Sequence, residues 1–170
     1  MRRMRRPRSA RPPERAAGGD LAEEAFEAAL GALARKERSI GEVRAWLEAR
    51  GFDGAAIAAA LERLSEAGQL DDARFAAAYA ADKRELRGWG SERTREALEA
   101  RGVGAGEIAA ALASDPDEAQ AERGAELLIA RRADLSGEAG RGRALAYLVR
   151  RGYGSEVAYE AVRRAERATL

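Results

Sequence analysis

Basic side chains gather around a tryptophan near the middle of this sequence. Residues 83–95 contain five basic and two acidic side chains, with Trp89 among them. Guanidinium and ammonium groups bind phosphates, and an aromatic ring can stack on a nucleic-acid base. The same residues would also fit a solvated helix face with ion pairs three or four positions apart. From the residues alone, binding and solvation both stay open as interpretations.

Similar basic residues recur later in the chain, at Arg131-Arg132 and at Arg150-Arg151. If the basic residues form a contact surface, they would face an acidic protein surface or the phosphates of a nucleic acid. The complete set of candidate surface residues is Arg74, Lys83, Arg84, Arg87, Arg93, Arg95, Arg131, Arg132, Arg143, Arg150 and Arg151.

Catalytic chemistry has few candidate residues here. The sequence contains no histidine and no cysteine, which removes the commonest general base, the commonest metal ligand and every thiolate. The acidic pair Asp71-Asp72 is adjacent in sequence, so its carboxylates point to different faces of a helix, and it fits a helix start better than a metal site. The glycines at 102–106 follow a helical pattern and do not match the dinucleotide-binding spacing. We therefore predict no enzyme, no cofactor and no metal site.

The elements that would position these side chains are helices. Charged residues make up 35% of the chain and aromatic residues only 5%, while alanine supplies much of the hydrophobic fraction. This composition is typical of thin helical layers. No stretch alternates with period two, so we predict an all-α chain. No apolar run reaches the roughly 20 residues of a membrane span, and we expect a cytoplasmic protein.

Three glycines reveal a repeat. Gly51, Gly102 and Gly152 each follow a helical pattern that ends in arginine, and an apolar residue comes next. Glycine is the usual residue just past a helix end, where the backbone turns left-handed. A period near fifty residues indicates stacked helical units. We predict three modules of three helices, at residues 20–69, 70–114 and 115–168, which need no partner to fold and fit a monomer.

Helix starts and buried stripes can be predicted within these modules. Asp20, Ser39 and Asp115 are each followed three residues later by glutamate, the spacing of a capping box. Ser91 is the predicted N-cap of the helix after Trp89. Spacings of three and four residues place four side chains on one face of a helix: Phe75, Tyr79, Asp82 and Leu86. This pattern predicts an apolar stripe that is broken once, by Asp82.

The first 19 residues differ from the rest. They hold seven arginines, one glutamate and three prolines, with almost nothing to bury. This composition predicts a disordered tail. The tail can be read as a solvated extension or as a basic arm that touches nucleic acid or an acidic partner.

A helical module that reads DNA sequence is a further alternative. Helical units of this size can dock in a major groove. However, the third helix of each of the first two modules is mostly alanine on its outer side and, apart from Arg63, lacks the arginine, asparagine and glutamine that read base edges. Sequence-specific DNA recognition is therefore disfavoured.

The middle of the chain resembles the bacterial RecX regulatory proteins. The resemblance rests on Leu70-Asp71-Asp72-Ala73-Arg74-Phe75-Ala76, then Tyr79, Lys83-Arg84, Gly88-Trp89-Gly90, Leu98 and Gly102, with support from 34–47 and 141–153. It covers roughly residues 21–167. Ser91 stands where the family often has proline, and Thr94 where a branched apolar residue is common.

The resemblance implies three tandem three-helix repeats in an elongated, curved array. It also implies binding to the RecA filament on single-stranded DNA, which would restrain recombinase, ATPase and co-protease activity in DNA repair, recombination and the SOS response. Weak direct DNA contact could accompany it. A non-specific single-stranded-DNA-binding module and a helical scaffold without nucleic acid are the alternatives.

Overall fold

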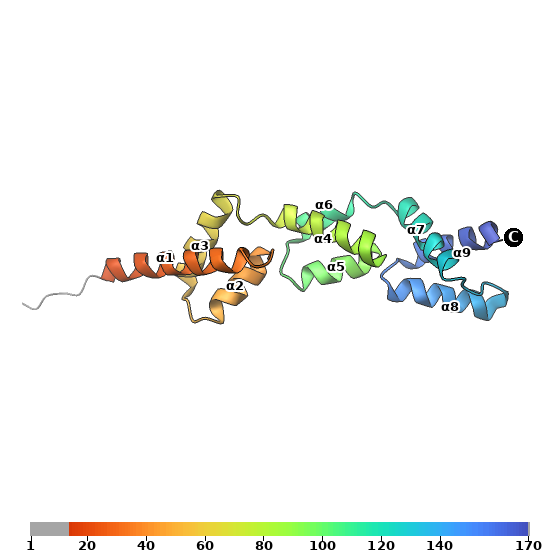
Figure 1. Cartoon of the computed structure of the whole chain (residues 1–170), viewed down its shortest axis with the longest axis horizontal. Coiled ribbons are helices and arrows are strands. Elements are labelled where there is room, and N and C mark those ends of the chain that lie inside the picture. Colours follow the sequence, from red (N-terminus) through yellow and green to blue (C-terminus); the bar gives the residue numbers. More distant parts are fainter. Residues whose placement is uncertain (1–13, 170) are drawn as a thin grey trace, which may run out of the picture. The chain divides into compact units, whose positions relative to one another are not determined.

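The structure, a computed structural model, describes residues 14–169, with side chains from residue 19 onward. Over this range it contains nine helices and no strand (Figure 1), which confirms the predicted all-α class. None of these helices is long and apolar enough to cross a membrane. The helices are α1 (Glu14–Leu33), α2 (Ile40–Glu48), α3 (Gly54–Glu66), α4 (Asp72–Arg87), α5 (Ser91–Glu99), α6 (Ala105–Leu112), α7 (Asp117–Ala130), α8 (Gly137–Arg150) and α9 (Ser155–Thr169).

The described residues form two compact units. The first unit contains residues up to 36 together with 43–69, and the second contains residues 37–42 together with 70–169. We call α1–α3 the first module, α4–α6 the second and α7–α9 the third. The predicted module boundaries, and the elongated curvature implied by the resemblance, stay predictions.

In the first unit α1 packs against α3. The buried side chains of α3 are Ala56, Ile57, Ala60, Leu61 and Leu64, which recur at helical spacing. Helix α1 contributes the buried residues Ala25, Ala29 and Ala32. Since alanine leaves little volume beyond its backbone, these two helices can lie close together. Asp53 caps α3 by accepting a hydrogen bond of 2.8 Å from the amide of Ala56.

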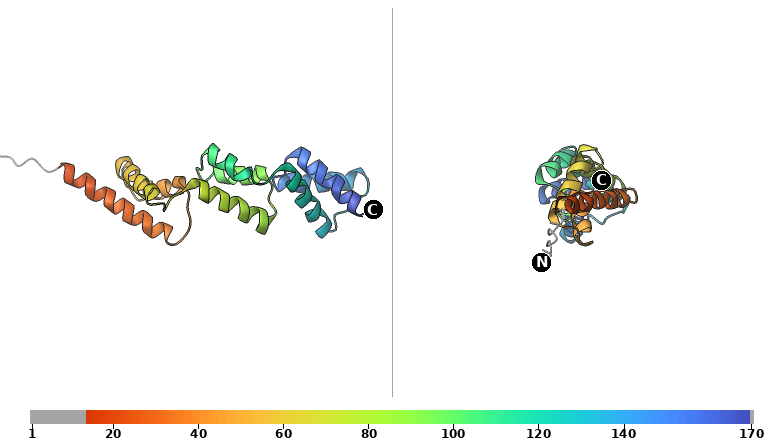
Figure 2. Two further views of the ribbon diagram at one scale, coloured as in Figure 1. Left: turned by 90° about the horizontal axis from the view of Figure 1, so that it is seen from above. Right: turned by 90° about the vertical axis from the view of Figure 1, so that its left-hand side faces the viewer.

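The second unit has two hydrophobic clusters. One is formed by α4, α5 and α6 around Leu98 and Ile108, with Phe75 and Tyr79 packed against it. The other is formed by α7, α8 and α9 around Leu128, Leu148 and Tyr153. Helices α7 and α9 lie against each other in this second cluster (Figures 1 and 2). Each module of this unit therefore has a core of its own.

The three repeated glycines have the backbone that the sequence predicts. Their φ angles are +85° at Gly51, +74° at Gly102 and +88° at Gly152. An L side chain rarely adopts this left-handed conformation. The turns between the second and third helices of the three modules are therefore local copies of one geometry.

Two predictions about α1 and α4 are wrong. Helix α1 begins at Glu14, so Asp20 lies inside the helix and does not cap it. Residues 1–13 of the predicted tail lie outside the described residues. Leu86 was expected on the apolar stripe of α4 but is 77% exposed. The fully covered positions of α4 are Ala76 and Ala80, because small side chains let α6 approach.

Candidate binding surface

Helix α4 presents the most characteristic residues of the sequence, and its two ends are fixed by the expected groups. Asp71 is the N-cap, and its Oδ1 accepts a hydrogen bond of 2.9 Å from the amide of Arg74. Gly88, with φ +59°, is the left-handed C-cap. Between them, the rings of Phe75 and Tyr79 stack with centroids 6.1 Å apart.

Asp72 has a second role that the sequence did not indicate. Its Oδ1 accepts a hydrogen bond of 2.8 Å from the amide of Ile40. Burial raises the pKa of the Asp72 carboxyl, and the hydrogen bond from Ile40 opposes this effect. Asp72 therefore holds the segment 37–42 to the second module.

The segment 37–42 packs against the turn at Gly102, and we call such a contact between modules a joint. The amide of Ser39 donates to Glu42 and the amide of Glu42 donates to Ser39, so the predicted capping box is confirmed. The Ser39 hydroxyl also donates to the carbonyl of Arg101, 2.5 Å away. A Cβ on Gly41 would lie only 2.7 Å from that same carbonyl oxygen. Backbone therefore packs directly on backbone at this joint.

The same joint recurs between the second and third modules. The amide of Gly90 donates to the carbonyl of Arg151, and the amide of Glu92 donates to the carbonyl of Gly152, both at 2.9 Å. A Cβ on Gly90 would lie 2.3 Å from the Gly152 oxygen. The turn of the third module thus satisfies donors at the start of α5 that the helix itself leaves free.

Two predicted N-caps are therefore wrong. The N-cap of α5 is Gly90, not Ser91, and the amide of Ser91 donates instead to Gln120 of the third module. The N-cap of α7 is Pro116, which makes no side-chain cap. Asp115 makes a two-fold hydrogen-bonded ion pair with Arg123, at 2.9 and 2.7 Å. In both cases a contact with another side chain took the place of the predicted cap.

A buried polar group completes this joint. The side-chain oxygen of Gln120 accepts a hydrogen bond from the amide of Ser91, and its side-chain nitrogen donates one to the carbonyl of Asp115. Tyr153 is 1% exposed and its hydroxyl donates to the carbonyl of Gly88, 3.3 Å away. Burial raises the pKa of Tyr153. The second and third modules are therefore tied by polar as well as backbone contacts.

Basic side chains of α4 and α5 gather on two aromatic rings, which form what we call the Trp89 cluster. The Lys83 ammonium lies 4.7 Å from the ring centroid of Tyr79 and 5.6 Å from that of Trp89. The Arg93 guanidinium lies 4.3 Å from the ring of Trp89. A cation over a ring face is attracted by the ring quadrupole. The Trp89 cluster is therefore Tyr79, Lys83, Trp89 and Arg93.

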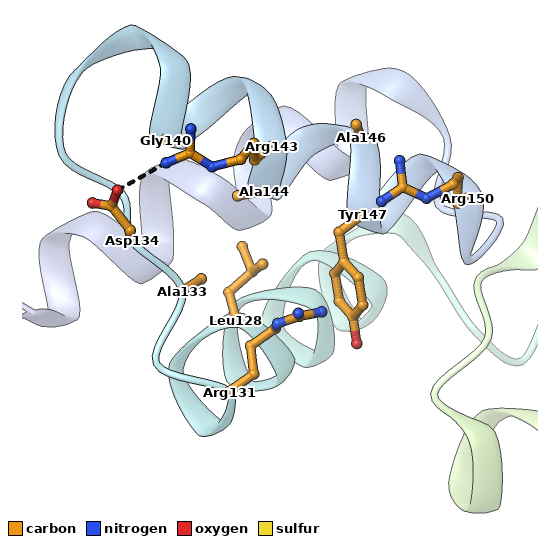
Figure 3. Close-up of a pocket in the computed structure, with 10 residues that line it drawn as sticks. All are labelled: Leu128, Arg131, Ala133, Asp134, Gly140, Arg143, Ala144, Ala146, Tyr147 and Arg150. Atoms are coloured by element: carbon orange, nitrogen blue, oxygen red, sulfur yellow. Dashed lines mark hydrogen bonds and ion pairs between the residues drawn. The ribbon is translucent and has the colours of Figure 1, made fainter.

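The third module has a second such group. The Arg131 guanidinium lies 3.9 Å from the ring of Tyr147, and the Arg151 guanidinium 5.0 Å from it. Arg131, Arg143 and Arg150 line one hollow of about 350 Å³ beside Tyr147. Figure 3 shows Arg131 directed at the ring of Tyr147 and Arg150 extending toward that ring from the end of α8. We call this the α7–α8 hollow.

The candidate basic residues thus fall into three groups. Lys83 and Arg93 belong to the Trp89 cluster, and Arg131, Arg143, Arg150 and Arg151 surround Tyr147 or line the hollow beside it. Arg87 accepts a hydrogen bond from Arg151 at its carbonyl, next to the joint. None of these groups includes Arg74, Arg84 or Arg132. Arg95 also lies outside them and pairs with Glu92, 3.9 Å away.

Sequence reasoning missed one pattern. An aromatic residue stands four positions before a basic one in five pairs: Trp46–Arg50, Tyr79–Lys83, Trp89–Arg93, Tyr147–Arg151 and Tyr159–Arg163. The first four make cation–ring contacts, the closest at 3.4 Å between Arg50 and Trp46, whereas Arg163 pairs with Glu160. Spacing of four residues on a helix would have indicated them. Arg101 was missed as well, and it contacts both Glu42 and the Tyr79 ring.

Comparison with known proteins extends these observations. Residues 25–64 match the model described as RecX, first three-helix domain, and residues 71–112 match RecX, second three-helix domain. A protein of Stenotrophomonas maltophilia named Regulatory protein RecX is 36% identical over 97% of this chain and 91% of its own length. A Deinococcus radiodurans protein of the same name is 39% identical, over 79% of this chain and 63% of that protein.

Solved structures share the fold. A crystal structure of RecX from Lactobacillus salivarius superposes with a TM-score of 0.79 at 18% identity, covering 87% of this chain and 98% of that one. A second crystal structure, of a regulatory protein RecX, gives a TM-score of 0.75 at 24% identity. At these identities the likeness concerns the fold alone.

Proposed function

We propose, since the chain belongs to the RecX family of regulatory proteins, that it binds the RecA filament on single-stranded DNA and restrains its activities. The family membership rests on the 36% identity with a relative that it covers almost entirely. Binding would lower recombinase, ATPase and co-protease activity in DNA repair, recombination and the SOS response. The protein would act in the cytoplasm, as a monomer, without a cofactor and without catalysing a reaction.

The observation that carries the contact surface is the Trp89 cluster. Two cations and two aromatic rings lie together at the end of α4 and the start of α5. Arg93 is exposed and Lys83 is half-buried. Aromatic and arginine side chains are the commonest energetic centres of protein interfaces. This cluster offers both, and basic charge would complement an acidic or phosphate-bearing surface of the filament.

The main experiment adds the purified protein below stoichiometric amounts to RecA filaments and follows DNA-dependent ATP hydrolysis. Inhibition under these conditions supports filament regulation. Unchanged hydrolysis at every ratio would overturn it. Inhibition that disappears when free single-stranded DNA is in large excess would favour the alternative, a non-specific single-strand-binding module.

Two variants then test the surface. Lys83→Gln with Arg93→Gln should weaken inhibition about tenfold, the loss expected for one or two charge-assisted contacts. Arg35→Gln with Arg44→Gln removes the same charge from exposed positions of the first module and should have little effect. Equal losses in the two double variants would show that only overall charge matters, and the Trp89 cluster would no longer be the proposed contact.

A further inference from the structure

The α7–α8 hollow has an unusual charge balance. Its lining contains three arginines and one acid, Asp134. Among the described residues, neither Arg131 nor Arg150 forms an ion pair with a carboxylate. Most other arginines of the third module are paired in that way: Arg123, Arg141, Arg143, Arg163, Arg164 and Arg167. The guanidinium groups of Arg131 and Arg150 face the same hollow as the ring of Tyr147 (Figure 3).

Asp134 positions the third arginine of the hollow. Its Oδ2 accepts a hydrogen bond of 2.9 Å from Arg143, and its Oδ1 accepts hydrogen bonds from the amide and hydroxyl of Ser136. The hydrogen bonds from Ser136 keep the pKa of Asp134 below its usual range, so it stays ionised. Arg143 is thereby held at one side of the hollow, and the net charge of the lining is positive.

We propose that the α7–α8 hollow binds a phosphate group of a single-stranded nucleic acid, through Arg131 and Arg150, with Arg143 adding charge. The planar guanidinium fork matches two phosphate oxygens, which a lone ammonium cannot do. The proposal goes beyond the RecA filament contact and does not depend on it.

A nucleic acid is favoured over an acidic peptide by what lies next to the hollow. Arg93 of the Trp89 cluster donates to the carbonyl of Arg150, 3.5 Å away, so the second group of cations and rings adjoins the first. Cations alternate with aromatic rings across this joint, at Trp89 and at Tyr147. Such an arrangement is typical of surfaces that follow a single strand, where bases stack on rings and phosphates meet cations.

The test measures fluorescence anisotropy of a labelled oligothymidylate with the full chain, in the absence of RecA. Arg131→Gln with Arg150→Gln should weaken binding about tenfold. It should also make the slope of log affinity against log salt shallower by roughly 0.7, the value for one lost phosphate contact on a single strand. Arg163→Gln with Arg167→Gln is the matched control, since these arginines are exposed on α9 and pair with Glu160.

A second variant separates fork geometry from charge. Arg131→Lys with Arg150→Lys keeps the charge, so affinity should fall while the salt slope stays as in the unchanged protein. Circular dichroism checks that all variants fold. The proposal is overturned if the glutamine variant binds no worse than the control. It is equally overturned if a polyglutamate peptide competes as well as the oligonucleotide at the same charge, because the hollow would then be a carboxylate site.

Discussion

The amide of Gly90 donates a hydrogen bond to the carbonyl oxygen of Arg151, although the two residues belong to different modules. The contact uses only backbone groups, and the missing Cβ of Gly90 is what allows it. In the other joint of the second unit Gly41 comes equally close to the carbonyl of Arg101, but there the hydrogen bond to that carbonyl comes from the Ser39 hydroxyl. Both joints place the start of one module's second helix on the glycine turn of the next module.

Replacing Gly90 by alanine should strongly destabilise the second unit. The added Cβ would lie 2.3 Å from a backbone oxygen, which no rotamer change relieves. We expect a loss of about 3 kcal/mol in unfolding free energy, at the upper end for overpacking, measured by urea denaturation. Gly142→Ala is the control, because its Cβ would meet nothing within 4 Å. That variant should be neutral or slightly more stable, since alanine favours a helix. Equal stability of the two variants would contradict the close approach.

Asp115→Asn should also destabilise the start of the third module. Asp115 is 8% exposed and makes the two-fold contact with Arg123, so the neutral amide leaves a guanidinium without a counter-charge. A loss of about 3 kcal/mol is expected for breaking a buried pair, read from thermal unfolding. Glu23→Gln removes an acid from the exposed pair with Arg63 and should change the unfolding temperature little. Similar shifts in both variants would show that burial does not matter here.

Asp72→Asn should reveal a pH-dependent cost. Burial raises the pKa of Asp72, so ionisation costs more in the folded state than in the unfolded one. The amide keeps an oxygen that can accept from Ile40 and carries no charge. At pH 7 this variant should be at least as stable as the unchanged protein, whereas Asp72→Ala should be less stable.

The sign of this effect follows from linkage. Because the folded pKa is the higher one, the contribution of Asp72 to stability is greatest at low pH and falls as pH rises through the two pKa values. The difference between Asp72→Asn and the unchanged protein should therefore vanish below about pH 3.9, the unfolded value. A difference in unfolding free energy between the two proteins that grew as the pH fell would contradict a raised pKa of Asp72. Denaturant unfolding at a series of pH values provides the measurement.

Ser39→Ala should loosen the joint at Gly102. The hydroxyl of Ser39 both accepts from Glu42 and donates to Arg101, and the residue is fully buried. Loss of the cap and of the second hydrogen bond should cost about 2 kcal/mol. Hydrogen exchange of the amides at 40–42 should become faster. Ser155→Ala, at the exposed start of α9, should leave stability nearly unchanged.

The sequence was informative wherever a local rule determined the outcome. Helical spacing predicted that Phe75 and Tyr79 lie on one apolar face, and the left-handed turns at Gly51, Gly102 and Gly152 followed from glycine alone. It failed where a distant residue supplied the partner. Ser91 has the chemistry of an N-cap, yet Gln120 and Gly152 satisfy the start of α5 instead.

The candidate surface was predictable only in part. The arginines could be counted, but which of them would gather was determined by helix packing. Arg95 pairs with Glu92 on its own helix, whereas Arg131 and Arg150 meet beside Tyr147 because the end of α7 lies near α8. The aromatic–cation spacing of four residues was a usable signal. No signal in the sequence indicated that Arg93 would approach Arg150, which belongs to another module.

The amide–carbonyl contacts between the second and third modules have a consequence for evolution. Every residue except proline carries both groups, so most side chains at this joint can be exchanged while these two modules stay docked, provided the close-approach positions remain small. Sequence can then drift far faster than architecture. The crystal structure from Lactobacillus salivarius, at 18% identity and a TM-score of 0.79, is consistent with such drift. The surfaces are thereby left free to diverge toward different partners.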